Sequence, residues 1–161
     1  MAESSLRAAR PVRKGGLPNV LFVVAAAERP PAELTGIAAE VTILMPWGSL
    51  LRGALALDDA CDAATGIVAL LAPDGAIRIL LSIDPRDRLS LPVLDERTAG
   101  DLAARWLEHD LTLTAFAPAD VAAIAATGSS WARRLRAGHE RTTWHVELAR
   151  PSSDGDLADR R

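Results

Sequence analysis

The sequence predicts an α/β fold, in which helices separate the strands of one sheet. Short continuous apolar runs, at 19–25 and 40–45, are typical of strands that are covered on both faces. Segment 95–109 has a helical pattern instead, because Leu102 and Trp106 stand four positions apart on one apolar stripe. Both patterns recur along the chain, so we expect a sheet whose strands are joined by helices.

Five segments have the residue pattern of a β-strand. The last of them alternates cleanly, so that Trp144, Val146 and Leu148 face one way and the polar residues between them face the other. Trp144 is therefore expected in the core. The predicted strands are 19–25, 40–45, 76–83, 111–116 and 141–148.

Helices and loops connect these strands. Leucines and alanines crowd one side of 50–57, which predicts a helix after the preceding glycine turn. Pro73-Asp74-Gly75 predicts a turn, and Trp106 is expected in the core. The predicted helices are 3–10, 50–57, 61–71, 95–109 and 119–126, the predicted loops are 84–94 and 127–138, and the polar tail 151–161 is expected to be disordered beyond a domain at 1–150.

The composition limits the classes of protein to which the chain can belong. Its 161 residues, 49% of them hydrophobic, suffice for one domain with its own core. No apolar run approaches the ~20 residues that a membrane-spanning helix needs, and 1–14 has no signal-peptide core. The net charge of −3 argues against binding nucleic acid through bulk charge. We expect a cytoplasmic protein without membrane contact, and the single cysteine, Cys61, fits a reducing compartment.

No metal site is predicted. The three histidines lack the spacing of metal ligands and have no nucleophile partner. Asp58, Asp59 and Asp62 could together bind a cation, but acidic residues on the solvated side of a helix are the simpler interpretation.

The run 40–45 ends in an unusual turn, Pro46-Trp47-Gly48-Ser49. Strand ends ordinarily carry polar turn residues, because their backbone must meet water. Ligands bind at the carboxyl ends of the strands in open α/β sheets, so Trp47 predicts a platform for another flat ring. Packing of Trp47 in the core is the alternative interpretation.

A second tryptophan, Trp131, stands among arginines in a predicted loop. The planar fork of arginine binds phosphates and stacks on bases, so this cluster is compatible with RNA contact. A GC-rich genome would also raise the arginine content, although it accounts less well for the clustering. Two tryptophans on separate loops predict a clamp for a nucleobase. The basic groups are Arg7, Arg10, Arg13 and Lys14, and Arg133, Arg134, Arg136 and Arg141.

Four segments carry a family resemblance: Arg-Lys-Gly-Gly-Leu-Pro-Asn (13–19), Phe-Val-Val-Ala-Ala-Ala-Glu (22–28), Leu-Met-Pro-Trp-Gly-Ser-Leu-Leu-Arg-Gly (44–53) and Ser-Ser-Trp-Ala-Arg-Arg-Leu (129–135). They resemble the kanamycin–apramycin resistance methyltransferases, which modify N1 of adenine 1408 in 16S ribosomal RNA. The last two segments are specific to that family. The resemblance covers about 140 of the 161 residues. It implies the Rossmann-like sheet of class I S-adenosylmethionine-dependent methyltransferases, with an antiparallel last strand.

The resemblance also implies roles for individual residues. Trp47 and Trp131 would hold the flipped adenine between them as the catalytic pair. The residues implied for the S-adenosylmethionine pocket are Ala26, Glu28, Leu44, Ser49 and Ser129, and those implied for RNA binding are Arg13, Lys14, Arg134 and Arg141.

One part of the family pattern is missing from this sequence. The family fold begins with a strand, a glycine-rich turn and a second strand ending in an acid, and this chain begins after them. In the family sheet order 3-2-1-4-5-7-6, the strand 19–25 then lacks a neighbour and the edge of 40–45 lies open. We expect a sheet truncated at the amino terminus because the true start lies upstream. The alternatives are that 19–25 pairs elsewhere or that a partner completes the sheet.

The function implied by the resemblance is S-adenosylmethionine-dependent methylation of N1 of adenine 1408 in the 16S rRNA of the 30S subunit, which confers aminoglycoside resistance. The expected partner is 16S rRNA, and the chain is expected to be a monomer. Two alternatives remain open. One is a non-catalytic truncated homologue that keeps the RNA-binding loops, and the other is a methyltransferase of the same fold with another substrate.

Overall fold

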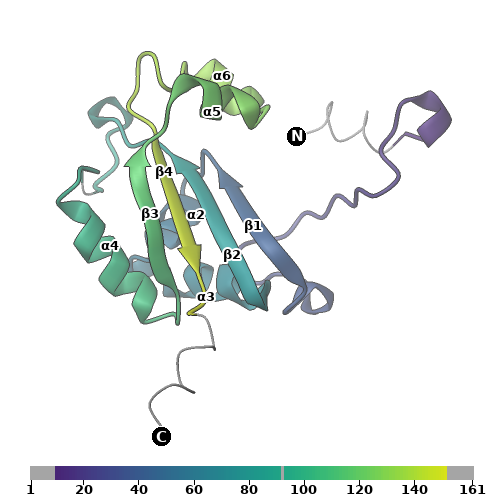
Figure 1. The fold of residues 1–161 in the computed structure, drawn as a ribbon, viewed down its shortest axis with the longest axis horizontal. Coiled ribbons are helices and arrows are strands. Elements are labelled where there is room, and N and C mark those ends of the chain that lie inside the picture. The colour runs from purple at the N-terminus through teal and green to yellow at the C-terminus, as the bar shows by residue number, and fades with distance from the viewer. Residues whose placement is uncertain (1–9, 92, 152–161) are drawn as a thin grey trace, which may run out of the picture.

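Four strands form one sheet in the computed structural model, which describes residues 10–91 and 93–151 (Figure 1). Strand β1 (Ala38–Leu44) runs parallel to β2 (Leu71–Leu81). Strand β4 (Trp144–Ala149) lies antiparallel between β2 and β3 (Thr112–Pro118). The order β1-β2-β4-β3 equals the 4-5-7-6 part of the expected sheet, so the α/β class and the antiparallel last strand are confirmed.

Helices cover one face of this sheet. Alternate strand residues such as Ile77, Ile79 and Val146 are fully buried against that helical layer. Trp106 is also fully buried there, and Trp144 is 7% exposed and stacks on Phe116, so both tryptophans are core residues as predicted. The covering helices are α2 (Ser49–Ala54), α3 (Cys61–Ala69) and α4 (Thr98–Leu107).

A second, smaller apolar cluster lies at the carboxyl ends of β1 and β2. Two short helices, α5 (Val121–Ala126) and α6 (Ser130–Arg134), pack there (Figure 1). The cluster consists of Met45, Leu80, Ile124, Ala132 and Ala137. It fixes the two helices to the end of the sheet at which parallel α/β folds bind their ligands.

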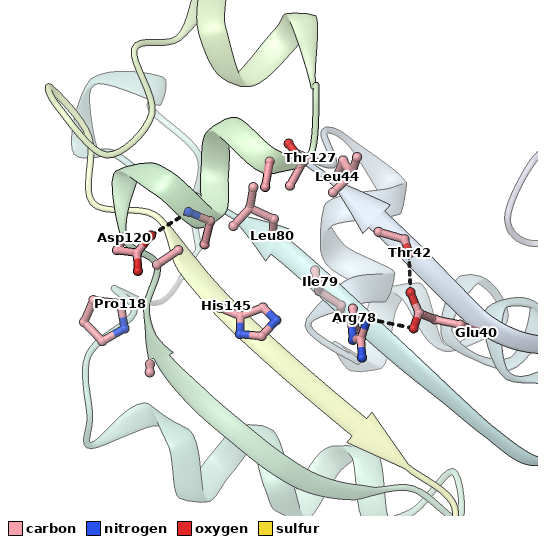
Figure 2. Close-up of a pocket in the computed structure, with 14 residues that line it drawn as sticks. Glu40, Thr42, Leu44, Arg78, Ile79, Leu80, Pro118, Asp120, Thr127 and His145 are labelled. Carbon is pink, nitrogen blue, oxygen red and sulfur yellow. Dashed lines mark hydrogen bonds and ion pairs between the residues drawn. The ribbon is translucent and has the colours of Figure 1, made fainter.

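The face of the sheet opposite α2, α3 and α4 carries a groove of about 510 Å³. Figure 2 shows Glu40 accepting a hydrogen bond from Thr42 at 3.1 Å and pairing with Arg78 at 2.9 Å on its floor. Leu44 and His145 also line it. The structure therefore describes a sheet with a continuous helical layer on one side only.

Three predictions of local structure are wrong. The run 19–25 is not a strand, because a strand needs a hydrogen-bonded neighbour and no described segment supplies one. Residues 73–75 do not form a turn before the strand, because β2 begins at Leu71 and runs through them, and its register with β1 shifts between Ala38 and Glu40. The loop 127–138 contains the helix α6, which Ser129 caps.

The remaining connections agree with the sequence pattern. Four short 3₁₀ turns interrupt the described loops: η1 (Val12–Lys14), η2 (Ala32–Leu34), η3 (Asp58–Ala60) and η4 (Pro85–Asp87). The predicted helix at 3–10 and the tail 151–161 lie outside the described residues, apart from Arg10 and Pro151. In the described part of the chain, every helix is too short or too polar to cross a bilayer.

Candidate functional site

The turn after β1 holds Trp47 at the surface. Met45 and Pro46 are buried, whereas the Trp47 side chain is 50% exposed. The Met45 N–H donates to the Leu80 carbonyl at 2.7 Å, which keeps the turn on the end of β2. Gly48 has a φ of 61°, a region that favours glycine and lets the chain turn directly into α2. The structure thus presents the Trp47 ring to solvent, where the sequence predicted a stacking platform.

Helix α6 presents the second tryptophan. The Ser129 hydroxyl accepts a hydrogen bond from the Ala132 N–H at 3.1 Å and caps the helix. Ala132 is buried, whereas Trp131 is 44% exposed. The Arg134 guanidinium carbon lies 5.4 Å from the centroid of the Trp131 ring, within the range of a cation–π contact. The surface of α6 therefore offers an indole with a cation against it.

The two tryptophan-bearing segments share one apolar cluster. Met45 precedes Trp47 by two residues, Ala132 follows Trp131 directly, and both belong to that cluster with Leu80. Packing of α6 on the end of β1 therefore brings segments that are far apart in the sequence to the same end of the sheet. Neither indole is a core side chain.

A cavity of about 460 Å³ begins beside the Trp47 turn. Ser49 at the start of α2 lines it together with Ala26 and Glu28, so three of the five predicted cofactor-pocket residues are brought together. Its walls are apolar, and the residues that form them are Val41, Ile43, Leu50, Ile67 and Leu70. The arrangement is an apolar slot with a carboxylate and a hydroxyl at one side.

Glu28 is held in its charged form in this cavity. Its own backbone N–H and the Ser49 hydroxyl lower the pKa of the Glu28 carboxyl from its ordinary value. A carboxylate that is ionised at neutral pH accepts hydrogen bonds and donates none. Glu28 can therefore bind a ligand that presents N–H or O–H donors.

A glycine on α3 fixes the position of the Glu28 segment. A Cβ atom built on Gly66 would lie 1.8 Å from the Ala27 carbonyl oxygen, far inside any van der Waals contact. The backbone of 26–28 therefore packs directly on α3. The cavity depends on this close approach, because Ala26 and Glu28 flank Ala27 in the sequence.

The other two predicted pocket residues lie elsewhere. Leu44 lines the groove on the opposite face of the sheet, because side chains alternate along β1 and Val41 and Ile43 take the cavity side. Ser129 caps α6 and lines a depression of about 420 Å³ between α5 and α6. The described geometry does not join either residue to Glu28.

Arg141 takes part in a buried network that the sequence did not predict. Its guanidinium pairs with Asp87, and the two side chains are only 9% and 10% exposed. The Arg141 Nε also donates to the Ser82 hydroxyl at 3.4 Å, and that hydroxyl donates to the Thr142 carbonyl at 2.6 Å. The loop after β2 is thereby tied to the loop that precedes β4.

A second tie strengthens this connection. Arg86 donates to the Glu140 carbonyl at 3.0 Å and to both carboxylate oxygens of Asp84 at 2.8 and 2.7 Å. The hydrogen bonds from Arg86 hold the pKa of Asp84 well below its ordinary range and raise the pKa of Arg86. The one sequence signal near this network is the Asp-Pro-Arg-Asp motif at 84–87, which begins three residues after the last residue of β2.

The remaining predicted RNA-binding residues are on the surface. Arg134 is exposed on α6. Arg13 and Lys14 are exposed in η1, on the amino-terminal segment that extends away from the sheet (Figure 1). In 10–91 and 93–151, no three His, Cys, Asp or Glu side chains are grouped so that they could hold a metal ion.

Comparison with known proteins places this chain in a family. Residues 1–150 match the family model NpmA, described as 16S rRNA (adenine(1408)-N(1))-methyltransferase. A protein of that name from Streptoalloteichus hindustanus is 36% identical over 148 residues, which are 88% of this chain and 66% of the relative. A second protein of that name, from Streptoalloteichus tenebrarius, is 34% identical over 148 residues, again 88% of this chain and 66% of the relative. The chain thus spans just under two thirds of the length of these relatives.

Solved structures agree with the sequence matches. A mutant 16S rRNA (adenine(1408)-N(1))-methyltransferase from Catenulisporales acidiphilia, crystallised with its cosubstrate SAM, superposes with a TM-score of 0.77 at 31% identity, over 96% of this chain and 71% of that protein. The 16S rRNA methyltransferase KamB gives the same TM-score and the same identity, and the superposition covers 94% of this chain and 72% of KamB. The chain belongs to the 16S rRNA (adenine(1408)-N(1))-methyltransferase family.

Proposed function

We propose that this chain takes part in S-adenosylmethionine-dependent methylation of N1 of adenine 1408 in the 16S rRNA of the 30S subunit, the reaction that confers aminoglycoside resistance. One observation carries the proposal. Two half-exposed tryptophans stand at the end of the sheet where α/β folds bind ligands, and the turn of one leads into the Glu28–Ser49 cavity. Because that substrate lies in the ribosome, the proposed site of action is the cytoplasm.

The cavity beside Trp47 fits the adenosyl part of S-adenosylmethionine. Its apolar walls suit the faces of a purine, and the ionised Glu28 would accept hydrogen bonds from an exocyclic amine or from ribose hydroxyls. Ala26 leaves room for the ring edge, and Ser49 would stand between the cavity and Trp47. We keep Leu44 and Ser129 as proposed members of the wider pocket through the family resemblance alone.

Little acid–base chemistry is needed for this reaction. S-adenosylmethionine, when bound, supplies an electrophilic methyl group. Adenine N1 is neutral and has an in-plane lone pair at physiological pH, so it requires no general base. Trp47 and Trp131 would stack on the two faces of the flipped base, and each contact returns roughly 1–3 kcal/mol against the few kcal/mol that flipping costs. Their π-faces would also stabilise the positive charge that develops on the methylated ring.

Basic side chains would hold the RNA around this clamp. Arg134 lies against Trp131 and is exposed, so it can reach a phosphate while keeping its contact with the indole. Arg13 and Lys14 would add a second contact on the amino-terminal segment. Arg141 stays a proposed RNA contact through the family resemblance alone, because its side chain is only 9% exposed and pairs with Asp87.

A non-catalytic role is the second candidate. The given sequence contains no Asp-x-Gly-x-Gly motif of the kind expected to hold the cofactor, and it spans 66% of the length of a curated relative. A chain that keeps the tryptophan loops but does not retain the cofactor would bind 30S subunits without modifying them.

The test combines cofactor binding with methyl transfer. Titration calorimetry with S-adenosylmethionine is expected to give a binding isotherm that Glu28→Ala abolishes. Transfer of a tritiated methyl group to isolated 30S subunits is expected to be lost in Trp47→Ala and in Trp131→Ala, while ribosome binding weakens only slightly. Leu107→Ala is the matched control, because Leu107 is 64% exposed on α4, outside the candidate site. Binding to 30S subunits without cofactor binding or transfer would establish the second candidate instead.

A further inference from the structure

A closed connection between β3 and β4 carries Trp131. It runs from Ala119 to Thr143 and contains α5 and α6. Its two ends meet, because the Ala119 N–H donates a hydrogen bond to the Thr143 carbonyl at 2.8 Å. Trp131 lies midway between these ends in the sequence, far from the point where they are joined. The position of this tryptophan therefore depends on what holds the middle of the connection against the end of the sheet (Figure 1).

The small apolar cluster at this end of the sheet holds the middle of the connection. It contains Ile124 of α5 and Ala132 of α6, and its members from the sheet side are Met45 and Leu80. Met45 follows β1 directly and is 6% exposed, and Trp47 stands two positions after it. The Met45 side chain thus packs in one cluster with α6, while its backbone leads into the turn of Trp47.

The backbone of Met45 is held in an unusual conformation. Its φ is 49°, in the left-handed region that residues with a side chain seldom adopt. Such a conformation persists only where the surroundings determine it, and conformations of this kind gather at functional sites. Here the Met45 N–H donates to the Leu80 carbonyl at 2.7 Å, and burial of the side chain fixes its orientation. The direction in which the chain leaves β1 toward Trp47 is therefore set at Met45.

We propose that Met45 is the positioning residue that sets the separation of Trp47 and Trp131. Its backbone orients the turn of the first tryptophan, and its side chain supports the helix of the second. Side-chain volume at this one position therefore determines the width of the gap between the two segments. That a base occupies the gap rests on the proposed function, whereas the separation is a property of the protein without any ligand. Met45 acts only through the two tryptophans.

Distances between spin labels test the separation directly. Cys61, the exposed free cysteine, is replaced by serine, and nitroxides are attached in Trp47→Cys/Trp131→Cys, where the native side chains are 50% and 44% exposed. Double electron–electron resonance on the full chain is expected to give one narrow distance distribution. Met45→Ala is expected to broaden it, because alanine keeps the Cβ atom but removes the supporting side chain. Met45→Leu is expected to keep it narrow, because this exchange conserves volume.

A second variant and a matched control separate positioning from loss of stability. Ala132→Val adds volume on the α6 side of the cluster, where Ala132 is 1% exposed, and is expected to shift the distribution to longer distances. It carries the test if circular dichroism shows that Met45→Ala does not fold. Leu102→Ala is the control, because Leu102 is also 1% exposed but belongs to the other cluster, on α4. The control is expected to lose stability without any change in the label distances.

Methyl transfer to 30S subunits gives the functional measurement. A misplacement of about 1 Å can cost about 10²-fold in rate, so Met45→Ala is expected to slow transfer at saturating 30S subunits by about that factor. The half-saturating concentration of subunits is expected to change little, because the basic residues proposed to hold the RNA are untouched. Met45→Leu is expected to keep most of the rate. Leu102→Ala, assayed below its melting temperature, is expected to match the parent.

Three results would overturn the proposal. The first is a distance distribution that is already broad in the parent. The second is a folded Met45→Ala, or an Ala132→Val, that keeps the parent's distribution. The third is a broadening in Leu102→Ala as large as in Met45→Ala, since any loss of core packing would then loosen the gap. The labels are measured without cofactor or RNA, so a parent that transfers no methyl group would count against the proposed function alone.

Discussion

Asp87→Asn is expected to destabilise the fold far more than its position in a loop indicates. The substitution leaves the Arg141 guanidinium, which is 9% exposed, without its counter-ion. Removing one member of a buried ion pair costs about 3–5 kcal/mol, a large share of the roughly 5–15 kcal/mol that stabilises a typical domain. For a chain of this length, that loss lowers the melting temperature by roughly 6–20 °C.

The assay is thermal unfolding followed by circular dichroism, with Asp59→Asn as the matched control. Asp59 pairs with Arg52 through side chains that are 59% and 35% exposed, and an exposed pair contributes at most about 1 kcal/mol. In Asp87→Asn, the asparagine keeps a side-chain oxygen that can accept the hydrogen bond that the Asp84 N–H makes to Asp87 at 3.2 Å, so the cap of η4 is retained. Equal melting temperatures for the two variants would refute the assignment of a structural role to the Asp87–Arg141 pair.

Three further predictions concern the site and its surroundings. Gly66→Ala is expected to abolish cofactor binding while the protein stays folded, because the added methyl group forces Ala27 and Glu28 off α3; unchanged calorimetry would contradict this. Trp131→Ala is expected to weaken binding of an adenine-containing RNA hairpin by about 1–3 kcal/mol with little change in melting temperature, as measured by fluorescence anisotropy, and an unaltered affinity would exclude stacking. The folded-state pKa of Asp84 is depressed, so its contribution to stability is present above the ordinary carboxyl pKa of about 4 and is lost as the pH falls below it. Denaturant midpoints across this acidic range should accordingly fall less steeply in Asp84→Asn than in the parent.

The sheet was the most predictable part of the fold. Alternation in 141–148 and the apolar stripe through Trp106 are direct consequences of burial on one face, and both patterns correctly predicted which side chains are buried. The run 19–25 was mispredicted because an apolar run indicates the capacity to form a strand, whereas pairing depends on a neighbour elsewhere in the chain. The turn predicted at Pro73-Asp74-Gly75 is replaced by an irregularity inside β2, because the ladder to β1 extends back to Leu71, which no local pattern records.

The candidate site was predicted unevenly for a similar reason. Trp47 and Ser49 follow the end of β1 in one turn, so their proximity follows from the local sequence, whereas Glu28 reaches the cavity beside them only because 26–28 packs on α3. The Asp87–Arg141 pair joins loops separated by 54 residues, and only the packing of β4 beside β2 brings them together. Side-chain polarity in those loops is compatible with solvent, RNA or a buried partner, and the sequence does not distinguish the three.

The central place of the last strand has a consequence for biosynthesis. β4 lies between β2 and β3, yet it is the last of these four strands to leave the ribosome. Until residues 144–149 emerge, β2 and β3 have no direct ladder between them, and Trp144 has not yet stacked on Phe116. The nascent chain therefore cannot join β3 to this sheet until late in translation, and a premature stop before Trp144 would release a β1–β2 pair and a separate, unpaired β3 to chaperones and proteases.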